Sequence, residues 1–110
     1  MTVGALCDLL DAKVLCGDTD KPFLGVYTGD LLSRAMSRVE ADCVWVTIMS
    51  NVNVAAVAAL SDVACVTLTE NVSPDPDLLA KAKAQGITLL GSSRGTYDAA
   101  VALAEALKES

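Results

Sequence analysis

Residues 43–49 read Cys43-Val44-Trp45-Val46-Thr47-Ile48-Met49, and this stretch decides the fold class. Every position except Thr47 is apolar, so apolar side chains fall on both faces of an extended chain. A strand with one face in water would instead alternate apolar and polar residues. The stretch is therefore typical of a central strand in a parallel sheet that helices cover on both sides.

Outward from this strand, strands and helices alternate four times from residue 23 onward. Strands are expected over residues 13–16, 23–27, 43–49, 64–68 and 87–90. Helices are expected over residues 3–11, 31–38, 52–60, 74–85 and 96–108. Asp75 or Ser73 should cap the helix that Pro74 and Pro76 open, and Gly86 should end it. The pattern predicts a single three-layer α/β domain over residues 1–110, a mainly parallel sheet with helices on both faces.

The composition restricts the class of protein. The 110 residues are 53% apolar and include 14 acidic and 8 basic residues, which gives a net charge of -6. This length fits one domain, and the apolar content excludes a disordered segment. The acidic balance argues against nucleic acid or an anionic membrane as a partner, because no basic patch is available. The absence of histidine excludes mechanisms that need an imidazole base or ligand.

The four cysteines show no C-x-x-C spacing, and no histidine is present to complete a zinc site. Cys7, Cys16, Cys43 and Cys65 have apolar neighbours, so we expect buried thiols in a reducing cytosol. The N-terminus lacks the basic residues of a signal peptide, and no run approaches the ~20 apolar residues of a transmembrane helix. We therefore expect a cytoplasmic protein.

The predicted helix over residues 52–60 is apolar on every side except at Asn53. A helix on the outside of a sheet normally carries a polar stripe. The last helix is also apolar over much of its surface. We expect at least one of the two to pack against another subunit or domain, and a second subunit would make a homodimer. The alternative is an alanine-rich surface that tolerates exposure to water.

Polar loops follow the predicted parallel strands, at the edge where ligands of open α/β sheets bind. Each loop leads into a helix, whose free N–H groups and dipole favour anions. Loop 91–96 is the richest and resembles a phosphate cradle. The alternative is ordinary helix capping. The candidate ligand-binding residues are Thr28, Asp30, Asn51, Asn53, Thr69, Ser92, Ser93, Arg94 and Thr96.

No catalytic motif is present in the chain. It contains no G-x-x-x-x-G-K-[ST] loop, no G-x-G-x-x-G loop after a strand and no G-x-S-x-G elbow. A serine nucleophile would have no histidine base. We expect no catalytic residue, no metal site and no cofactor.

Several segments, read in order, resemble the DRTGG-domain family. Residues 29–33, G-D-L-L-S, are similar to the family's S-D-L-L-S, and residues 42–48, D-C-V-W-V-T-I, to its G-D-I-W-I-T-I strand. Residues 53–60, N-V-A-A-V-A-A-L, are similar to its N-I-V-A-V-A-S-L helix. The end of the family pattern is matched at residues 73–75, 81–82 and 86–87. The resemblance runs from Leu24 to the C-terminus.

The residues that name the family are mostly replaced. Its aspartate–arginine pair falls near Asn51-Val52, and its T-G-G falls on Thr69-Glu70-Asn71, so only the threonine remains. The loss of two glycines and the gain of Glu70 should crowd and repel an anion at that loop.

The resemblance implies a fold similar to the N-terminal domain of HPr kinase/phosphorylase, without the kinase domain. It also implies a regulatory role as a dimer, often beside CBS domains or phosphotransacetylase. We expect a non-catalytic, ligand-sensing homodimer that responds to an adenine nucleotide or another small anion. The alternative is an interaction module that docks on a partner enzyme, such as one of an iron hydrogenase system, and binds no small molecule. HPr serine kinase activity is not expected.

Overall fold

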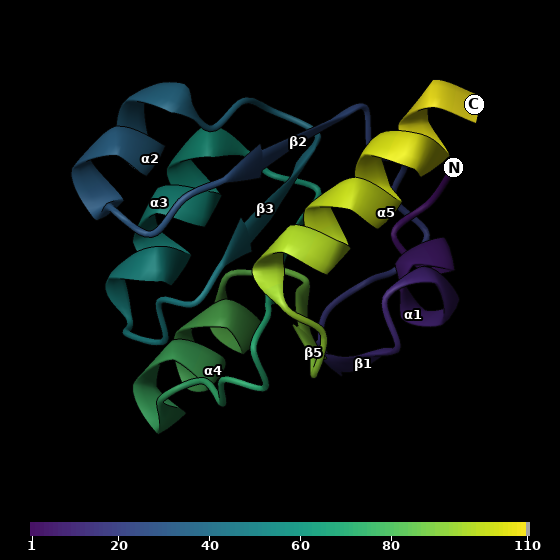
Figure 1. The fold of residues 1–110 in the computed structure, drawn as a ribbon. Coiled ribbons are helices and arrows are strands. Elements are labelled where there is room, and N and C mark those ends of the chain that lie inside the picture. Colours follow the sequence, from purple (N-terminus) through teal and green to yellow (C-terminus); the bar gives the residue numbers. More distant parts are fainter. Residues whose placement is uncertain (110) are drawn as a thin grey trace.

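The structure is a computed structural model and describes residues 1–109. Five strands and five helices follow one another along the chain (Figure 1). The strands are β1 (Ala12–Cys16), β2 (Gly25–Thr28), β3 (Cys43–Thr47), β4 (Cys65–Leu68) and β5 (Leu89–Ser92). The helices are α1 (Ala5–Leu9), α2 (Leu32–Arg38), α3 (Asn53–Ser61), α4 (Pro76–Ala84) and α5 (Thr96–Glu109).

The five strands form one sheet in the order β1-β5-β4-β3-β2. Strands β2 to β5 are parallel to their neighbours, as the alternating pattern predicts. Strand β1 pairs antiparallel with β5 at one edge, where Lys13 lies opposite Gly91 and Val14 opposite Leu90. The mainly parallel sheet is therefore confirmed, with one antiparallel edge strand.

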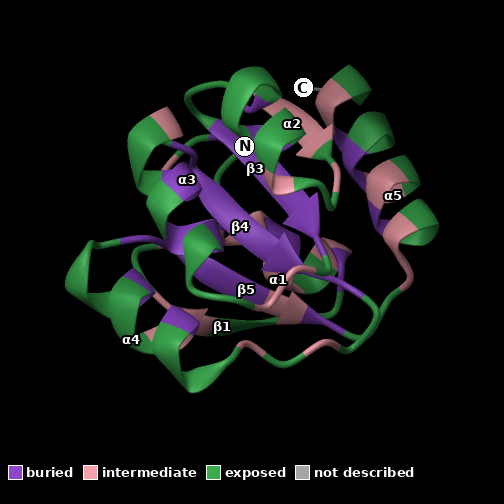
Figure 2. Ribbon diagram, turned by 90° about the vertical axis from the view of Figure 1, so that its left-hand side faces the viewer, coloured by how far each residue is buried: buried purple, intermediate pink, exposed green. Residues whose placement is uncertain are grey.

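Helices cover both faces of the sheet, as predicted. Helices α2, α3 and α4 lie on one face, and α1 and α5 lie on the other (Figure 1). Trp45 of β3 belongs to the core under α2–α4, whereas Val44 and Val46 belong to the core under α1 and α5. All five residues of β3 are buried, so this interior strand, which lies between β4 and β2, is covered on both sides (Figure 2).

Several boundaries differ from the sequence prediction. Strand β2 begins at Gly25, because the Phe23 amide donates to the Met1 carbonyl and pairing with β3 starts only at Gly25. Strand β3 ends at Thr47, because the amide of Ile48 donates to Asp30 Oδ1 and that of Met49 to Thr47 Oγ1. Strand β5 runs two residues beyond the predicted end, because its last residues pair with β1.

Helix α4 begins at Pro76 rather than Pro74, and neither predicted side chain caps it. Asp75 is the N-cap residue, but its Oδ1 instead accepts a hydrogen bond from Ser50 Oγ at 3.2 Å. Gly86 follows the helix with a φ of 69°, the left-handed conformation expected of a terminating glycine. Among residues 1–109, no helix has both the length and the apolar character that crossing a membrane requires.

All four cysteines are free thiols. Cys43 and Cys65 are buried, as predicted, whereas Cys7 and Cys16 are only half-buried. Loss of hydration on burial raises the pKa of the Cys65 thiol to about 12, and it also raises the pKa of Cys43 and Cys16. These three thiols are therefore poor nucleophiles near neutral pH.

Candidate functional site

The carboxyl ends of β2 to β5 lie at one edge of the sheet because these strands are parallel. The loops after β2, β3 and β4 lead to helices on one face, whereas the loop after β5 leads to α5 on the other (Figure 1). The loops after β4 and β5 therefore diverge. In open α/β sheets, ligands bind where neighbouring loops diverge in this way.

The loop after β4 is bound to the start of α5. Buried Thr69 shares a hydrogen bond of 2.7 Å with Thr96, hydroxyl to hydroxyl. The backbone amide of Thr96 donates to Glu70 Oε2 at 2.7 Å. The Glu70 carboxylate thus occupies the N-terminus of α5, where an incoming anion would otherwise find free N–H groups. Glu70 and Asn71 both adopt left-handed backbone, with φ of 60° and 59°.

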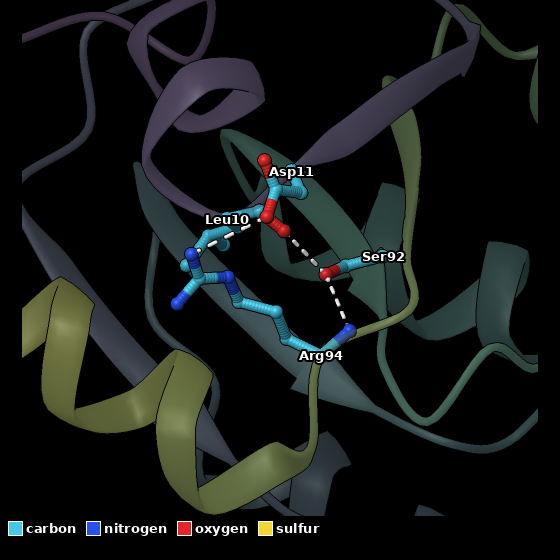
Figure 3. A network of polar contacts seen from close by, with 4 residues as sticks. All are labelled: Leu10, Asp11, Ser92 and Arg94. Carbon is cyan, nitrogen blue, oxygen red and sulfur yellow. Dashed lines mark hydrogen bonds and ion pairs between the residues drawn. The ribbon is translucent and has the colours of Figure 1, made fainter.

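The loop after β5 is bound to the end of α1 (Figure 3). The buried Ser92 hydroxyl donates to the Leu10 carbonyl at 2.6 Å and accepts from the Arg94 amide at 3.1 Å. The Arg94 guanidinium pairs with Asp11 at 3.3 Å, and both side chains are largely exposed. An exposed pair of this kind contributes at most about 1 kcal/mol. Ser92 therefore anchors α1, while Arg94 can exchange Asp11 for another anion at little cost.

Asp30 belongs to the loop after β2, and its side chain accepts hydrogen bonds from residues at the end of β3. Its Oδ1 accepts hydrogen bonds from Thr47 Oγ1 at 2.9 Å and from the Ile48 amide at 2.8 Å. The preceding carbonyl, of Gly29, accepts from the Trp45 indole N–H at 3.1 Å. These contacts fix the loop after β2 over the end of β3, with Thr28 exposed beside it.

Asn51 and Asn53 are both exposed at the start of α3. Asn51 Oδ1 accepts from the Asn53 amide at 3.0 Å. Within residues 1–109, the predicted ligand residues thus do not form one bonded site. Thr69, Thr96, Ser92 and Arg94 are linked through Glu70 at the ends of β4 and β5, and no side-chain hydrogen bond connects them to Thr28, Asp30, Asn51, Asn53 or Ser93.

A cavity of about 350 Å³ lies beside the diverging loops. Strand β1, the end of β5 and the segment before α4 enclose it. Its volume falls at the small end of the ~300–1,000 Å³ range of small-molecule sites. Of the predicted ligand residues, only Ser92 and Ser93 line it. The full lining is Asp11, Lys13, Leu15, Asn71, Val72, Ser73, Pro74, Gly91, Ser92 and Ser93.

Sequence reasoning missed Lys13, and it placed Asn71, Ser73 and Gly91 in loops at the carboxyl edge without naming them as ligand residues. Lys13 and Gly91 meet only because β1 adds to the sheet antiparallel to β5, 78 residues later in the chain. No local pattern signals that pairing. Asn71 and Ser73 stand in a polar loop after a strand, and that signal could have included them.

Comparisons with known proteins agree with this architecture. The family model of the DRTGG domain matches residues 5–106. No curated protein sequence was found to match the chain. A similar fold occurs in the crystal structure of the CBS and DRTGG domains of the regulatory region of Clostridium perfringens pyrophosphatase, complexed with its activator diadenosine tetraphosphate. The TM-score is 0.72 at 12% identity over 93% of this chain, which spans 45% of that one. The chain belongs to the DRTGG domain family.

Proposed function

We propose that this DRTGG domain is a non-catalytic regulatory domain that senses a small ligand. Its family membership and the regulatory role of the Clostridium perfringens neighbour support the class of function. The observation that carries the proposal is the polar cavity beside the diverging loops of β4 and β5, because a sensor needs a place for its ligand.

The proposed ligand is an adenine nucleotide or another small anion. The neighbour's activator is an adenine dinucleotide, which makes adenine nucleotides the first group to test. On this chain, Lys13 lines the cavity, and the Arg94 guanidinium pairs with Asp11, an exposed residue of the cavity wall that is its one ion-pair partner among residues 1–109. The wider proposed surface comprises the carboxyl-edge residues Thr28, Asp30, Asn51, Asn53, Thr69, Ser92, Ser93, Arg94 and Thr96.

Thermal unfolding tests this function directly. The protein is unfolded with AMP, ADP, ATP and diadenosine tetraphosphate in turn. A ligand at 100 times its Kd adds about 2.7 kcal/mol to the free energy of unfolding, which raises Tm on the order of 10 °C for a chain of this size. Arg94→Ala should reduce the rise if the guanidinium contacts the anion. An unchanged Tm with every nucleotide would contradict ligand sensing and favour the protein-docking alternative.

We also propose that the domain acts as a homodimer through the outer face of α3. Helix α3 contains no charged residue, and Leu60 near its end is 75% exposed. Ala56 and Ala59 are exposed on the same helix. Helix α2 packs against α3, and its N-cap residue Leu31 and its Met36 are 61% and 53% exposed. Helix α3 itself is uncharged, so two copies of a chain of charge -6 meet there with little local repulsion. The alternative occupant of this face is a partner enzyme.

A further inference from the structure

Gly91 contributes backbone and no side chain to the cavity wall, next to Leu15. Side chains alternate along β5: Ser92 points toward α1, and Leu89 packs into the core under α2–α4. Gly91 therefore faces the α2–α4 side, the same side as Leu89. A Cβ built on Gly91 would come within 3.3 Å of Leu15 Cδ1, so any larger side chain would extend into the cavity.

Four polar side chains on the cavity wall have no partner within the protein. The Lys13 ammonium, the Asn71 amide and the hydroxyls of Ser73 and Ser93 make no hydrogen bond or ion pair with any other residue among residues 1–109. The one carboxylate on the wall, Asp11, forms an ion pair with Arg94. This pairing reduces the repulsion between Asp11 and an anion in the cavity. The wall thus offers one cation and several neutral hydrogen-bonding groups.

The remaining wall is apolar, from Leu15, Val72 and Pro74. This combination suits a molecule with a flat body, a hydrogen-bonding edge and one anionic group. Resting on the proposed ligand-sensing function, we infer that the cavity over Gly91 binds a nucleoside monophosphate. Lys13 binds the phosphate, the Asn71 amide meets the edge of the base, and the apolar wall covers a face of the base. One lysine and a volume of about 350 Å³ fit one phosphate better than a polyphosphate chain.

Occupancy of the cavity would be transmitted to α5 through adjacent residues. The backbone N–H of Asn71 donates to the Ser92 carbonyl at 3.0 Å, and the backbone N–H of Glu70 donates to the Arg94 carbonyl at 2.8 Å. Glu70 also accepts from the amide of Thr96, the first residue of α5. A ligand that moves Asn71 therefore moves the residue that caps α5, although Thr96 does not line the cavity.

Titration of the ¹⁵N-labelled protein with AMP, followed by amide NMR, tests this inference. We expect shifts at Lys13, Asn71 and Gly91, and a smaller shift at Thr96. Gly91→Val should abolish AMP binding by filling the cavity. Gly25→Val is the matched control, since Gly25 lies on the opposite edge strand and has open space around its Cβ position.

Lys13→Ala keeps the test independent of how well Gly91→Val folds, because Lys13 is exposed. Lys13→Ala should raise the Kd for AMP about tenfold, the loss expected for a hydrogen bond to a charged group. It should leave the Kd for adenosine, which binds more weakly, unchanged. Lys108→Ala, near the end of α5, should change neither.

Each outcome separates this inference from the function on which it rests. If AMP binds Gly91→Val and Lys13→Ala as it binds the wild type, the ligand lies elsewhere and only the cavity assignment is overturned. If AMP causes no shifts while ADP, ATP or another nucleotide raises Tm, the monophosphate assignment is overturned and ligand sensing stands. If no nucleotide has any effect, both are overturned.

Discussion

At the scale of single residues, Glu70 and Asn71, which are expected from sequence position to match the two glycines of the family pattern, adopt the left-handed backbone that glycine adopts most readily. Both φ values are close to 60°, which costs roughly 1 kcal/mol or more for a residue with a Cβ. The hydrogen bond from Thr96 to the Glu70 carboxylate offsets part of that cost. The sequence predicted that Glu70 repels an anion here, and the structure adds that its carboxylate takes the place of one.

The two effects at Glu70 can be separated by comparing two variants. Glu70→Ala removes the cap and keeps the strained φ, so the free energy of unfolding should fall by about 1 kcal/mol. Glu70→Gly also removes the cap but relieves the strain, so it should be more stable than Glu70→Ala by roughly 0.5–1 kcal/mol. Urea denaturation of both variants measures the difference. Equal stability of the two would show that the left-handed conformation at residue 70 costs nothing.

The buried thiol of Cys65 makes stability depend on pH in the alkaline range. Above pH 9.0 the unfolded chain loses this proton, whereas the folded chain keeps it up to about pH 12. The unfolded state then binds fewer protons, so the free energy of unfolding falls as pH rises, by about 1.4 kcal/mol per pH unit from this group. Cys65→Ala cannot ionise and should show a flatter profile between those two pH values. Parallel profiles for the two proteins would contradict the raised pKa.

At the scale of elements, the order and type of helices and strands could be predicted because each apolar run is bounded by local turn and cap residues. The pairing of β1 could not, because it depends on contacts between Lys13 and Gly91 that are distant in sequence. The cavity could not be predicted for the same reason, because its cation, Lys13, comes from β1. The carboxyl edge was located correctly from the strand pattern, but the partners of Asp30 and Glu70 there are set by tertiary packing.

Helix α3 has no charged residue, yet part of it, including Leu60, is exposed to solvent in the single chain. Leu60→Glu should convert the proposed dimer to a monomer and change the free energy of unfolding of the monomer by no more than about 0.5 kcal/mol, because the side chain is on the surface. Size-exclusion chromatography with light scattering measures the mass.

Tyr97→Glu is the matched control for Leu60→Glu, because Tyr97 is 79% exposed on α5 at the opposite face of the sheet. It should leave the dimer intact. A dimer that survives Leu60→Glu and dissociates on Tyr97→Glu would move the interface to α5. If the wild-type protein is a monomer at every concentration, the proposed homodimer is contradicted, and a partner enzyme becomes the favoured occupant of the α3 face.

At the scale of the whole molecule, charge and apolar surface are distributed separately. The chain carries a net charge of -6, yet none of it lies on α3. Two copies that meet at this face bury apolar surface while their distant carboxylates repel each other. Both helices that pack against α3 carry cations, Lys81 and Lys83 on α4 and Arg34 and Arg38 on α2, and α2 also adds exposed Met36 to the proposed face. Whether those arginines join the interface decides how salt acts on the dimer.

Added salt should therefore strengthen the proposed dimer. Raising NaCl from 0.1 M to 1 M shortens the Debye length from about 10 Å to about 3 Å, which screens the repulsion between the two acidic copies. An uncharged interface loses nothing in return, so the Kd from sedimentation equilibrium should fall several-fold. If Arg34 or Arg38 instead paired with carboxylates of the second copy, screening would weaken those pairs and the Kd would rise. Arg34→Ala and Arg38→Ala separate these cases. If α3 alone makes the interface, each variant adds one negative charge per copy and makes the fall in Kd with salt steeper, whereas if the arginines are paired, each variant removes the rise.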